Sequence, residues 1–162
     1  MAQTPTPPPQ ISVVVPVFDE EGAAPDLARE IAAAFEGRNY EMIFVDDRSR
    51  DATLAVMTAM KAEFPALRVL SHRKNSGQSR SIRTGILAAR GEVILTLDGD
   101  GQNDPADGPV LVDALLAGPP ELALVGGERV KRQDSLSKKY ASRIANAARR
   151  ENLGTLTSAA GS

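Results

Sequence analysis

Short apolar runs rich in β-branched residues alternate with amphipathic stretches along most of this 162-residue chain. Strands that are apolar on both faces need cover on both faces, and only a crossover connection can join parallel neighbours. The pattern therefore predicts an α/β fold with a doubly wound, mostly parallel sheet. We expect strands at 11–17, 41–45, 68–71, 92–97 and 122–125, and helices at 26–35, from a cap at Ser49 or Asp51 to Phe64, at 77–90 and at 109–117.

The two ends of the chain lack this alternation. Residues 1–10 contain four prolines and no periodic apolar pattern, which predicts a disordered tail. A basic segment at 129–150 is expected to be helical from Ser135, and residues 151–162, which are small, polar and aperiodic, predict a second disordered tail. The expected organisation is one folded domain at 11–150 between these tails, because a chain of this length buries one core.

The composition excludes several kinds of protein and site. The chain has no cysteine and a single histidine, His72, so disulfides, thiolate metal sites and multi-histidine clusters are excluded. Its formal net charge of -2 provides no field that would gather nucleic acid. No apolar run approaches the roughly 20 residues that span a bilayer. These features predict a cytoplasmic protein without a transmembrane segment in this chain, and any metal must bind to oxygen ligands.

Acidic residues stand repeatedly where the predicted strands end. Ligands of an open parallel sheet bind outside the carboxyl ends of its strands, so these positions are candidate site residues. Clustered carboxylates repel one another unless cations or hydrogen-bond donors lie between them, and a bound metal with a nucleobase would supply both. The acidic residues at the ends of the first, second and fourth strands are Asp19, Glu20 and Glu21, then Asp46 and Asp47, then Asp98 and Asp100.

Asp98 and Asp100 form the most specific pair. They stand two residues apart at a predicted strand end, where alternate side chains share a face, and Gln102 adds a third oxygen. Such ligands suit Mg²⁺ or Mn²⁺ with positions left open for phosphate oxygens, which predicts a diphosphate ligand. An EF-hand loop is excluded because its sixth position would be Asn103 and its twelfth Pro109. On the short motif alone, a solvated turn remains an equal alternative.

Four ordered motifs carry a family resemblance. In this order and spacing they resemble the motifs of family 2 glycosyltransferases with the GT-A fold, a Rossmann-like nucleotide-diphospho-sugar transferase fold, and most of all the dolichyl-phosphate or undecaprenyl-phosphate sugar transferases. The resemblance covers residues 11–150, and because similar enzymes continue with further strands, it implies a chain truncated at its C-terminus. The motifs are Val-Val-Val-Pro-Val-Phe-Asp-Glu-Glu at 13–21, Phe-Val-Asp-Asp-Arg-Ser-Arg-Asp at 44–51, Asn-Ser-Gly at 75–77 and Thr-Leu-Asp-Gly-Asp-Gly-Gln-Asn-Asp-Pro at 96–105.

The resemblance implies a role for individual residues. It implies that Asp100 and Arg129 take part in catalysis and that Asp98, Asp100 and Gln102 hold Mg²⁺ or Mn²⁺. Adjacent strand residues point to opposite faces, so Asp46 and Asp47 should not share one role. Pro16 fits a plain strand end equally well, and Arg143 a solvated helix face. The residues implied to bind the donor are Pro16, Val17, Glu20, one of Asp46 and Asp47, Asp98 and Arg143.

The function that the resemblance implies is transfer of a sugar from a UDP- or GDP-sugar to an acceptor by metal-assisted, inverting displacement. The implied acceptor is a polyprenyl phosphate, met at the inner face of a membrane. The alternative is a truncated nucleotide-sugar-binding module without transfer activity. A nucleotidyltransferase is disfavoured because residues 17–21 contain no glycine-rich phosphate loop.

Overall fold

The computed structural model of the protein describes residues 7–100, 103–129 and 140–143. The chain divides into two compact units, residues 1–108 and residues 109–162. Of the predicted tails, residues 1–6 and 151–162 lie outside the described ranges. Residues 7–10 form no helix or strand, and the side chain of Asn39 donates a hydrogen bond to the carbonyl of Pro8 at 2.8 Å.

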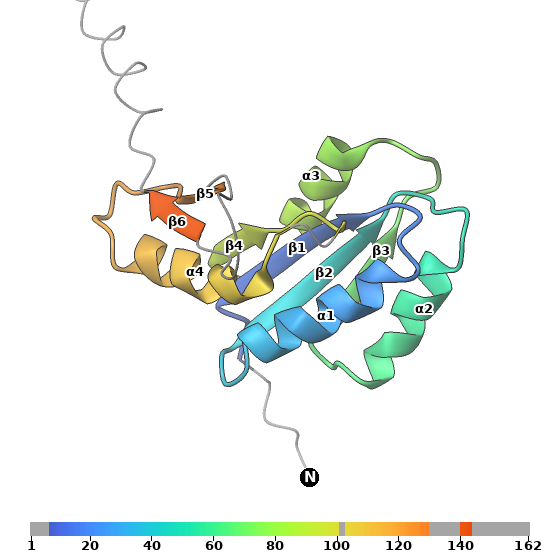
Figure 1. Ribbon diagram of the computed structural model, residues 1–162, viewed down its shortest axis with the longest axis horizontal. Coiled ribbons are helices and arrows are strands. Elements are labelled where there is room, and N and C mark those ends of the chain that lie inside the picture. The colour runs from blue at the N-terminus through green and yellow to red at the C-terminus, as the bar shows by residue number, and fades with distance from the viewer. Residues whose placement is uncertain (1–6, 101–102, 130–139, 144–162) are drawn as a thin grey trace, which may run out of the picture. The chain divides into compact units, whose positions relative to one another are not determined.

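The first unit is built on a parallel sheet of four strands (Figure 1). Their order across the sheet is β3-β2-β1-β4, and every neighbouring pair is parallel. β1 and β2 pair from Ile11 opposite Tyr40 to Val17 opposite Asp46, so both strands end at the same edge. The strands are β1 (Ile11–Val17), β2 (Tyr40–Asp46), β3 (Leu67–Ser71) and β4 (Val93–Thr96).

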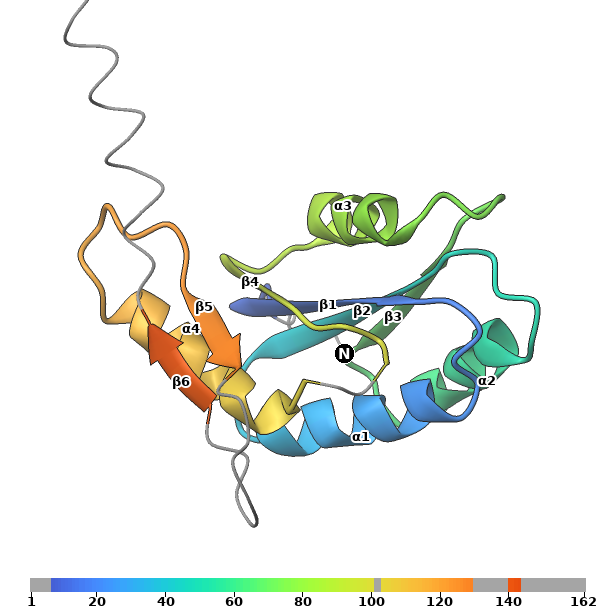
Figure 2. The same ribbon diagram turned by 45° about the horizontal axis from the view of Figure 1, so that its top comes forward.

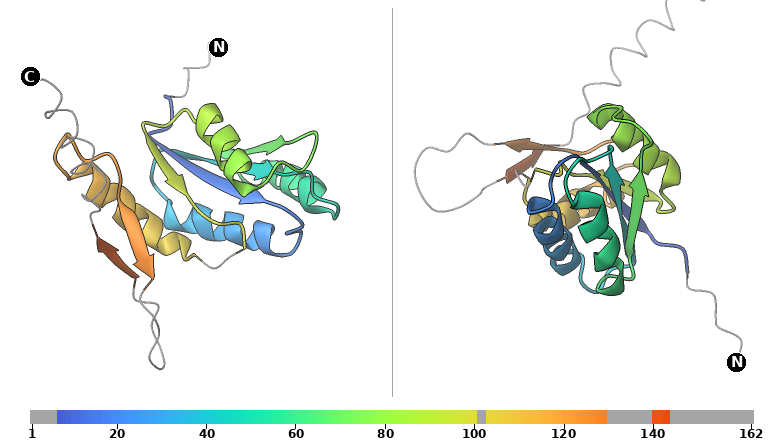
Figure 3. Two further views of the ribbon diagram at one scale, coloured as in Figure 1. Left: turned by 90° about the horizontal axis from the view of Figure 1, so that it is seen from above. Right: turned by 90° about the vertical axis from the view of Figure 1, so that its right-hand side faces the viewer.

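Helices cover both faces of this sheet. α1 and α2 lie on one face and α3 on the other (Figures 2 and 3). This arrangement confirms the predicted doubly wound α/β fold, because each helix links two parallel strands. The helices are α1 (Ala23–Ala34), α2 (Thr53–Ala59) with a 3-10 turn η1 (Met60–Ala62), α3 (Gln78–Ala88) and a second 3-10 turn η2 (Pro105–Asp107). In the described ranges, no helix is long and apolar enough to cross a membrane.

The core lies around the two central strands. Each buried aliphatic or aromatic side chain contributes about 1.5–3 kcal/mol relative to an exposed one, which makes β1 and β2 the rigid part of the unit. α1 adds Leu27 and Ile31, spaced four residues apart on its inner face. The fully buried side chains of the two central strands include Val13, Val14, Val15, Ile43, Phe44 and Val45.

A buried carboxylate, Glu41, ties together the amino ends of the central strands. Its Oε1 accepts hydrogen bonds from Ser12 Oγ and Arg90 N, both at 2.8 Å. Its Oε2 accepts from Arg68 Nη1 at 2.8 Å and from the Arg90 guanidinium at 2.8 and 3.0 Å. Burial by itself raises the pKa of Glu41, but the hydrogen bonds from Arg68, Arg90 and Ser12 outweigh it and lower the pKa to about 2.

The second unit contains one predicted element and differs from its prediction elsewhere. The helix predicted at 109–117 is confirmed as α4 (Gly108–Leu116), which belongs to this unit from Pro109 onward. It is followed by an antiparallel pair, β5 (Gly126–Arg129) and β6 (Tyr140–Arg143). The strand predicted at 122–125 is wrong: Leu122 N donates to the Pro119 carbonyl at 2.8 Å, so a turn occupies its start.

The helix predicted from Ser135 is also wrong where it can be compared. Residues 140–143 form β6, because pairing with β5 satisfies their backbone groups and overrides a local helical preference. The rest of that predicted helix lies outside the described residues.

Candidate active site

The carboxyl edge of the sheet in the first unit carries a pocket of about 220 Å³. Its wall is supplied by the loops that follow β1, β2 and β4 and by the start of α3. Six residues singled out from the sequence are among its lining: Pro16, Val17, Glu20, Asp47, Asp98 and Asp100. The other lining residues, which the sequence did not single out, are Phe18, Gln78, Ser81 and Gly99.

Asp98 and Asp100 reach this pocket by a different route from the predicted one. β4 ends at Thr96, and residues 99 and 100 form a turn, so strand alternation does not bring the two carboxylates together. The turn depends on Gly99, because a Cβ there would lie 2.3 Å from the carbonyl oxygen of Pro16. The close approach of Gly99 to the Pro16 carbonyl, at the end of β1, therefore allows both aspartates to line the pocket.

Side-chain amides hold the Asp98 carboxylate in place. Gln78 Nε2 donates to Asp98 Oδ1 at 2.7 Å, and Asn103 Nδ2 donates to Asp98 Oδ2 at 3.1 Å. Gln78 is the first residue of α3, so the start of this helix connects directly to the fourth strand's loop. Asp98 is half-buried, whereas Asp100 is exposed.

The fit of a divalent cation can be tested on this donor set. Two carboxylates on one pocket wall suit Mg²⁺ or Mn²⁺, which keep positions open for phosphate oxygens. The third predicted ligand, Gln102, lies outside the described residues. Within the described ranges, no group of three or more His, Asp or Glu side chains could hold a metal. Asp98 and Asp100 are the described residues that would hold such a cation.

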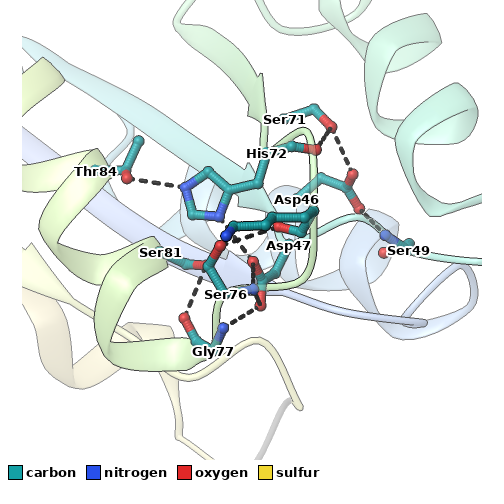
Figure 4. Close-up of polar contacts among 10 residues, drawn as sticks. Asp46, Asp47, Ser49, Ser71, His72, Ser76, Gly77, Ser81 and Thr84 are labelled. Atoms are coloured by element: carbon teal, nitrogen blue, oxygen red, sulfur yellow. Dashed lines mark hydrogen bonds and ion pairs between the residues drawn. The ribbon is translucent and has the colours of Figure 1, made fainter.

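Asp46 and Asp47 are separated as expected for neighbours at a strand end (Figure 4). Asp46 accepts hydrogen bonds from Ser49 N at 3.1 Å and from Ser71 Oγ at 2.9 Å. It is 1% exposed and is absent from the pocket lining, and its contacts join the end of β2 to the loop that follows it and to the end of β3. Asp47, 4% exposed, lines the pocket.

Asp47 is held by three donors that converge on its carboxylate. His72 Nδ1 lies 2.7 Å from Oδ1, Ser76 N lies 2.8 and 3.0 Å from the two oxygens, and Gly77 N donates to Oδ2 at 2.6 Å. Burial raises the pKa of Asp47, but these hydrogen bonds outweigh it and lower the pKa below its ordinary value. Gly77 has a φ of 88°, which glycine adopts without strain, so it turns its N–H toward the carboxylate before α3 begins.

The loop after β1 is bound to the loop after β2 by reciprocal hydrogen bonds. Asp19 N donates to Ser49 Oγ at 3.0 Å, and Glu20 N donates to Thr53 Oγ1 at 2.8 Å. In return, Arg50 N donates to Asp19 Oδ1 at 2.7 Å. These bonds fix the backbone beside Glu20, a pocket residue.

The acidic run in this loop is neutralised within the protein. The Arg50 guanidinium pairs with Asp19, which lowers the pKa of that carboxyl group, and it stacks over the Phe18 ring at 5.2 Å. Glu21 accepts from Ala52 N at 2.8 Å. The repulsion inferred from the sequence is therefore relieved, at Asp19 and Glu21, by a guanidinium and a backbone N–H of the protein itself.

Two predicted site residues belong to the second unit. Arg129 ends β5 and Arg143 ends β6, and their side chains lie outside the described part of the chain. Among the residues that sequence reasoning missed, His72 and Gln78 contact Asp47 and Asp98. Their positions could have indicated a role in the site: His72 directly follows β3, and Gln78 directly follows Gly77. Both positions fall at the carboxyl edge of the sheet, where ligands bind.

Comparison with protein families gives a match over nearly the whole chain. The family model described as "Glycosyl transferase family 2" matches residues 12–159. An undecaprenyl-phosphate 4-deoxy-4-formamido-L-arabinose transferase of Pseudomonas aeruginosa is 37% identical over 147 residues, 89% of this chain and 42% of the relative. A dodecaprenyl-phosphate galacturonate synthase of Rhizobium johnstonii is 42% identical over 130 residues, 78% of this chain and 38% of the relative. This chain thus spans less than half the length of these relatives.

Solved structures share the fold of the chain. A mannosyltransferase, PcManGT of Pyrobaculum calidifontis in complex with GDP-Man and Mn²⁺, superposes with a TM-score of 0.60 at 23% identity, over 73% of this chain and 35% of that one. S. aureus TarS in complex with UDP superposes with a TM-score of 0.54 at 25% identity, over 66% of this chain and 33% of that one. These similarities confirm the predicted GT-A type of α/β fold.

Proposed function

We propose a function from one premise: the chain belongs to glycosyl transferase family 2. The function is transfer of a sugar from a nucleoside diphosphate donor to a polyprenyl phosphate, with the donor held in the pocket at the carboxyl edge of the sheet. One observation carries the proposal. Residues from three separate motifs, Pro16 and Glu20, Asp47, and Asp98 and Asp100, line that single pocket.

The pocket offers two kinds of group, and each suits one part of the donor. Asp47 offers an anionic acceptor, which suits the N–H edge of uracil or guanine. Asp98 and Asp100 would hold Mg²⁺ or Mn²⁺, which when bound stabilises negative charge on the diphosphate. Pro16, Val17 and Phe18 also line the pocket and supply backbone and apolar surface. Asp46 has no contact with the pocket, so the proposed nucleoside contact belongs to Asp47.

The proposed reaction replaces one bond at the anomeric carbon of the sugar. An oxygen of the acceptor phosphate forms a bond to this carbon while the bond to the donor diphosphate breaks, which inverts the configuration. The nucleoside diphosphate leaves with the bonding electrons. A phosphate acceptor is already anionic at neutral pH, so the step needs no strong general base. Arg129 is proposed to stabilise the leaving group and Arg143 to bind phosphate.

The acceptor class follows from the names of the similar enzymes. Relatives named as undecaprenyl-phosphate and dodecaprenyl-phosphate enzymes match most of this chain. We therefore propose that the protein acts on a polyprenyl phosphate at a membrane surface. A second candidate function is a module that binds the donor without transferring its sugar.

A binding experiment tests the shared part of both candidates. Isothermal titration calorimetry of the chain with UDP and with GDP, each with and without Mn²⁺, should show binding that requires the metal. Asp100→Ala should abolish this binding while leaving the melting temperature unchanged, because Asp100 is exposed and contributes no core packing. Asp26→Ala, which removes an exposed carboxylate on α1, is the matched control. Metal-dependent binding that survives in Asp100→Ala would contradict the assignment.

A second assay separates the two candidates. The chain is incubated with radiolabelled UDP-sugars or GDP-mannose, Mn²⁺ and undecaprenyl phosphate, and the lipid fraction is counted. Label in the lipid fraction supports the transferase, whereas donor binding without label supports the binding module.

A further inference from the structure

His72 lies between the candidate nucleoside site and α3. It directly follows β3, and its side chain is 15% exposed. Its Nδ1 is 2.7 Å from Asp47 Oδ1, and its Nε2 is 2.9 Å from Thr84 Oγ1 on α3 (Figure 4). The imidazole therefore touches the pocket only through Asp47.

The two contacts determine which nitrogen of His72 carries a proton. An ionised carboxylate only accepts hydrogen bonds, so Nδ1 must be the donor toward Asp47. A threonine hydroxyl can donate or accept, so Thr84 can donate to Nε2 of the neutral ring. Asp47 thus fixes Nδ1 as the donor, and Thr84 holds the other ring nitrogen and so orients the imidazole.

The number of donors leaves one acceptor position of Asp47 for a ligand. A carboxylate has about four lone-pair sites, and three donor hydrogens are directed at this one, from His72 Nδ1, Gly77 N and Ser76 N, the last shared between both oxygens. The two backbone donors are fixed by the turn that starts α3. His72 is the one side chain among these three donors, so it is the one that substitution can remove without changing the backbone.

We propose that His72 is a positioning residue for base specificity, which aims the last acceptor position of Asp47 at a nucleobase N–H group. This inference rests on the proposed function, in which the pocket binds a nucleoside diphosphate. A carboxylate held in this way favours uracil or guanine, whose ring nitrogen carries a hydrogen. It disfavours cytosine or adenine, whose corresponding ring nitrogen is an acceptor and would face the carboxylate unpaired. Without His72, Oδ1 keeps only the hydrogen bond from Ser76 N, so the carboxylate is held less firmly and this discrimination is reduced.

Four variants test the inference by calorimetry with UDP, CDP, GDP and ADP, all in the presence of Mn²⁺. His72→Leu removes the donor, His72→Asn keeps an amide N–H on a shorter side chain, Thr84→Val removes the orienting hydroxyl, and Asp47→Asn removes the carboxylate. A hydrogen bond to a charged group corresponds to about ten- to a hundredfold in affinity. His72→Leu should weaken the preferred nucleotide by about that factor and reduce its preference over CDP or ADP.

The remaining variants distinguish positioning from a purely structural role. His72→Asn should restore most of the affinity and preference, and Thr84→Val should lose about threefold in affinity, a rough figure for a weaker, neutral hydrogen bond. In an Asp47→Asn background, His72→Leu should have no further effect, because His72 acts through Asp47. Circular dichroism and melting temperature establish that each variant is folded. If His72→Leu does not fold, Thr84→Val and His72→Asn decide the question through their nucleotide preference.

The experiment distinguishes a wrong role for His72 from a wrong proposed function. If the unmodified chain binds none of the four nucleotides, the proposed function is wrong. If it binds a nucleotide with a base preference and His72→Leu keeps both affinity and preference, the role of His72 is refuted. Equal losses in the Asp47 and Asp47→Asn backgrounds, or a His72→Asn variant as weak as His72→Leu, would also refute it.

Discussion

Glu41 and Asp47 are buried carboxylates at opposite ends of β2, and they differ in how their acceptor positions are used. Glu41 receives five hydrogen bonds, from Ser12, Arg68 and Arg90, and lines no part of the pocket. Asp47 receives four hydrogen bonds from three donors, two of them backbone N–H groups, and lines the pocket. A carboxylate whose acceptor positions are all used serves only to hold the fold together, whereas one with an acceptor position left can also bind a ligand. Both have lowered pKa values, so a pKa alone would not separate them.

The largest expected effect is a loss of stability on removing Glu41, at the amino end of β2. Glu41→Ala should lower the free energy of unfolding by about 3–4 kcal/mol, because it leaves the donors of Arg68 and Ser12 without their buried partner. Urea unfolding followed by circular dichroism measures this loss, with the exposed Glu30→Ala as the control. A loss no larger than that of the control would mean that the network contributes nothing.

Acid should remove the same contribution from the unmodified chain. The folded-state pKa of Glu41, about 2, lies below its ordinary value of 4.5, so its stabilisation is complete above about pH 4.5 and is lost as the pH falls toward 2. The expected loss is roughly 3 kcal/mol. Urea unfolding of the chain and of Glu41→Gln between about pH 6 and pH 2 tests this, because the stability difference between them should shrink in that window. A difference that stays constant would contradict the lowered pKa.

At Asp47, at the carboxyl end of β2, we expect a large effect on nucleotide binding and a small effect on stability. Asp47→Asn should weaken binding of UDP or GDP by roughly ten- to a hundredfold while lowering stability by only about 1 kcal/mol, because the two backbone donors keep one oxygen acceptor. Glu41→Gln is the matched control, with the same change at the other end of β2 and no expected loss of affinity. Calorimetry with Mn²⁺ measures the affinities. Equal losses in the two variants would remove the distinction between the two ends.

The smallest effect is expected from a single arginine of the Glu41 network. Arg90→Ala should cost less than about 1 kcal/mol, because the Arg90 side chain is 59% exposed and Arg68 continues to neutralise Glu41. Thermal unfolding of Arg90→Ala and of Arg68→Ala, whose side chain is 32% exposed, ranks the two partners. A larger loss for Arg90 than for Arg68 would show that exposure does not govern this network.

Much of the first unit could be predicted because its signals are local in the sequence. β1 occupies the predicted residues 11–17, and the alternation of strands and helices placed Asp47, Asp98 and Asp100 at one edge of the sheet. What failed depends on pairing between distant residues. β5 and β6 are short strands that satisfy each other's backbone groups, and nothing in the run at 122–125 reveals that it begins as a turn after Pro119.

Details of the site were out of reach for the same reason. Carboxylates at strand ends indicate that cations or hydrogen-bond donors lie nearby, but the sequence does not identify which residues supply them. Asp19 finds Arg50, thirty-one positions along the chain, and Asp47 finds His72, twenty-five positions along. Only the assembled sheet brings such residues together, so the sequence indicates where ligands bind better than it indicates what holds the binding residues in place.

The contact between Gly99 and the Pro16 carbonyl has a consequence for engineering donor preference. Any side chain at position 99 would push the turn bearing Asp98 and Asp100 away from the end of β1. The spacing between these aspartates and Pro16 would then change. Libraries intended to change which sugar nucleotide is accepted should therefore leave this glycine untouched. Diversity introduced at Phe18, which is 39% exposed and borders the same space, should alter its shape without changing the spacing of the aspartates from β1.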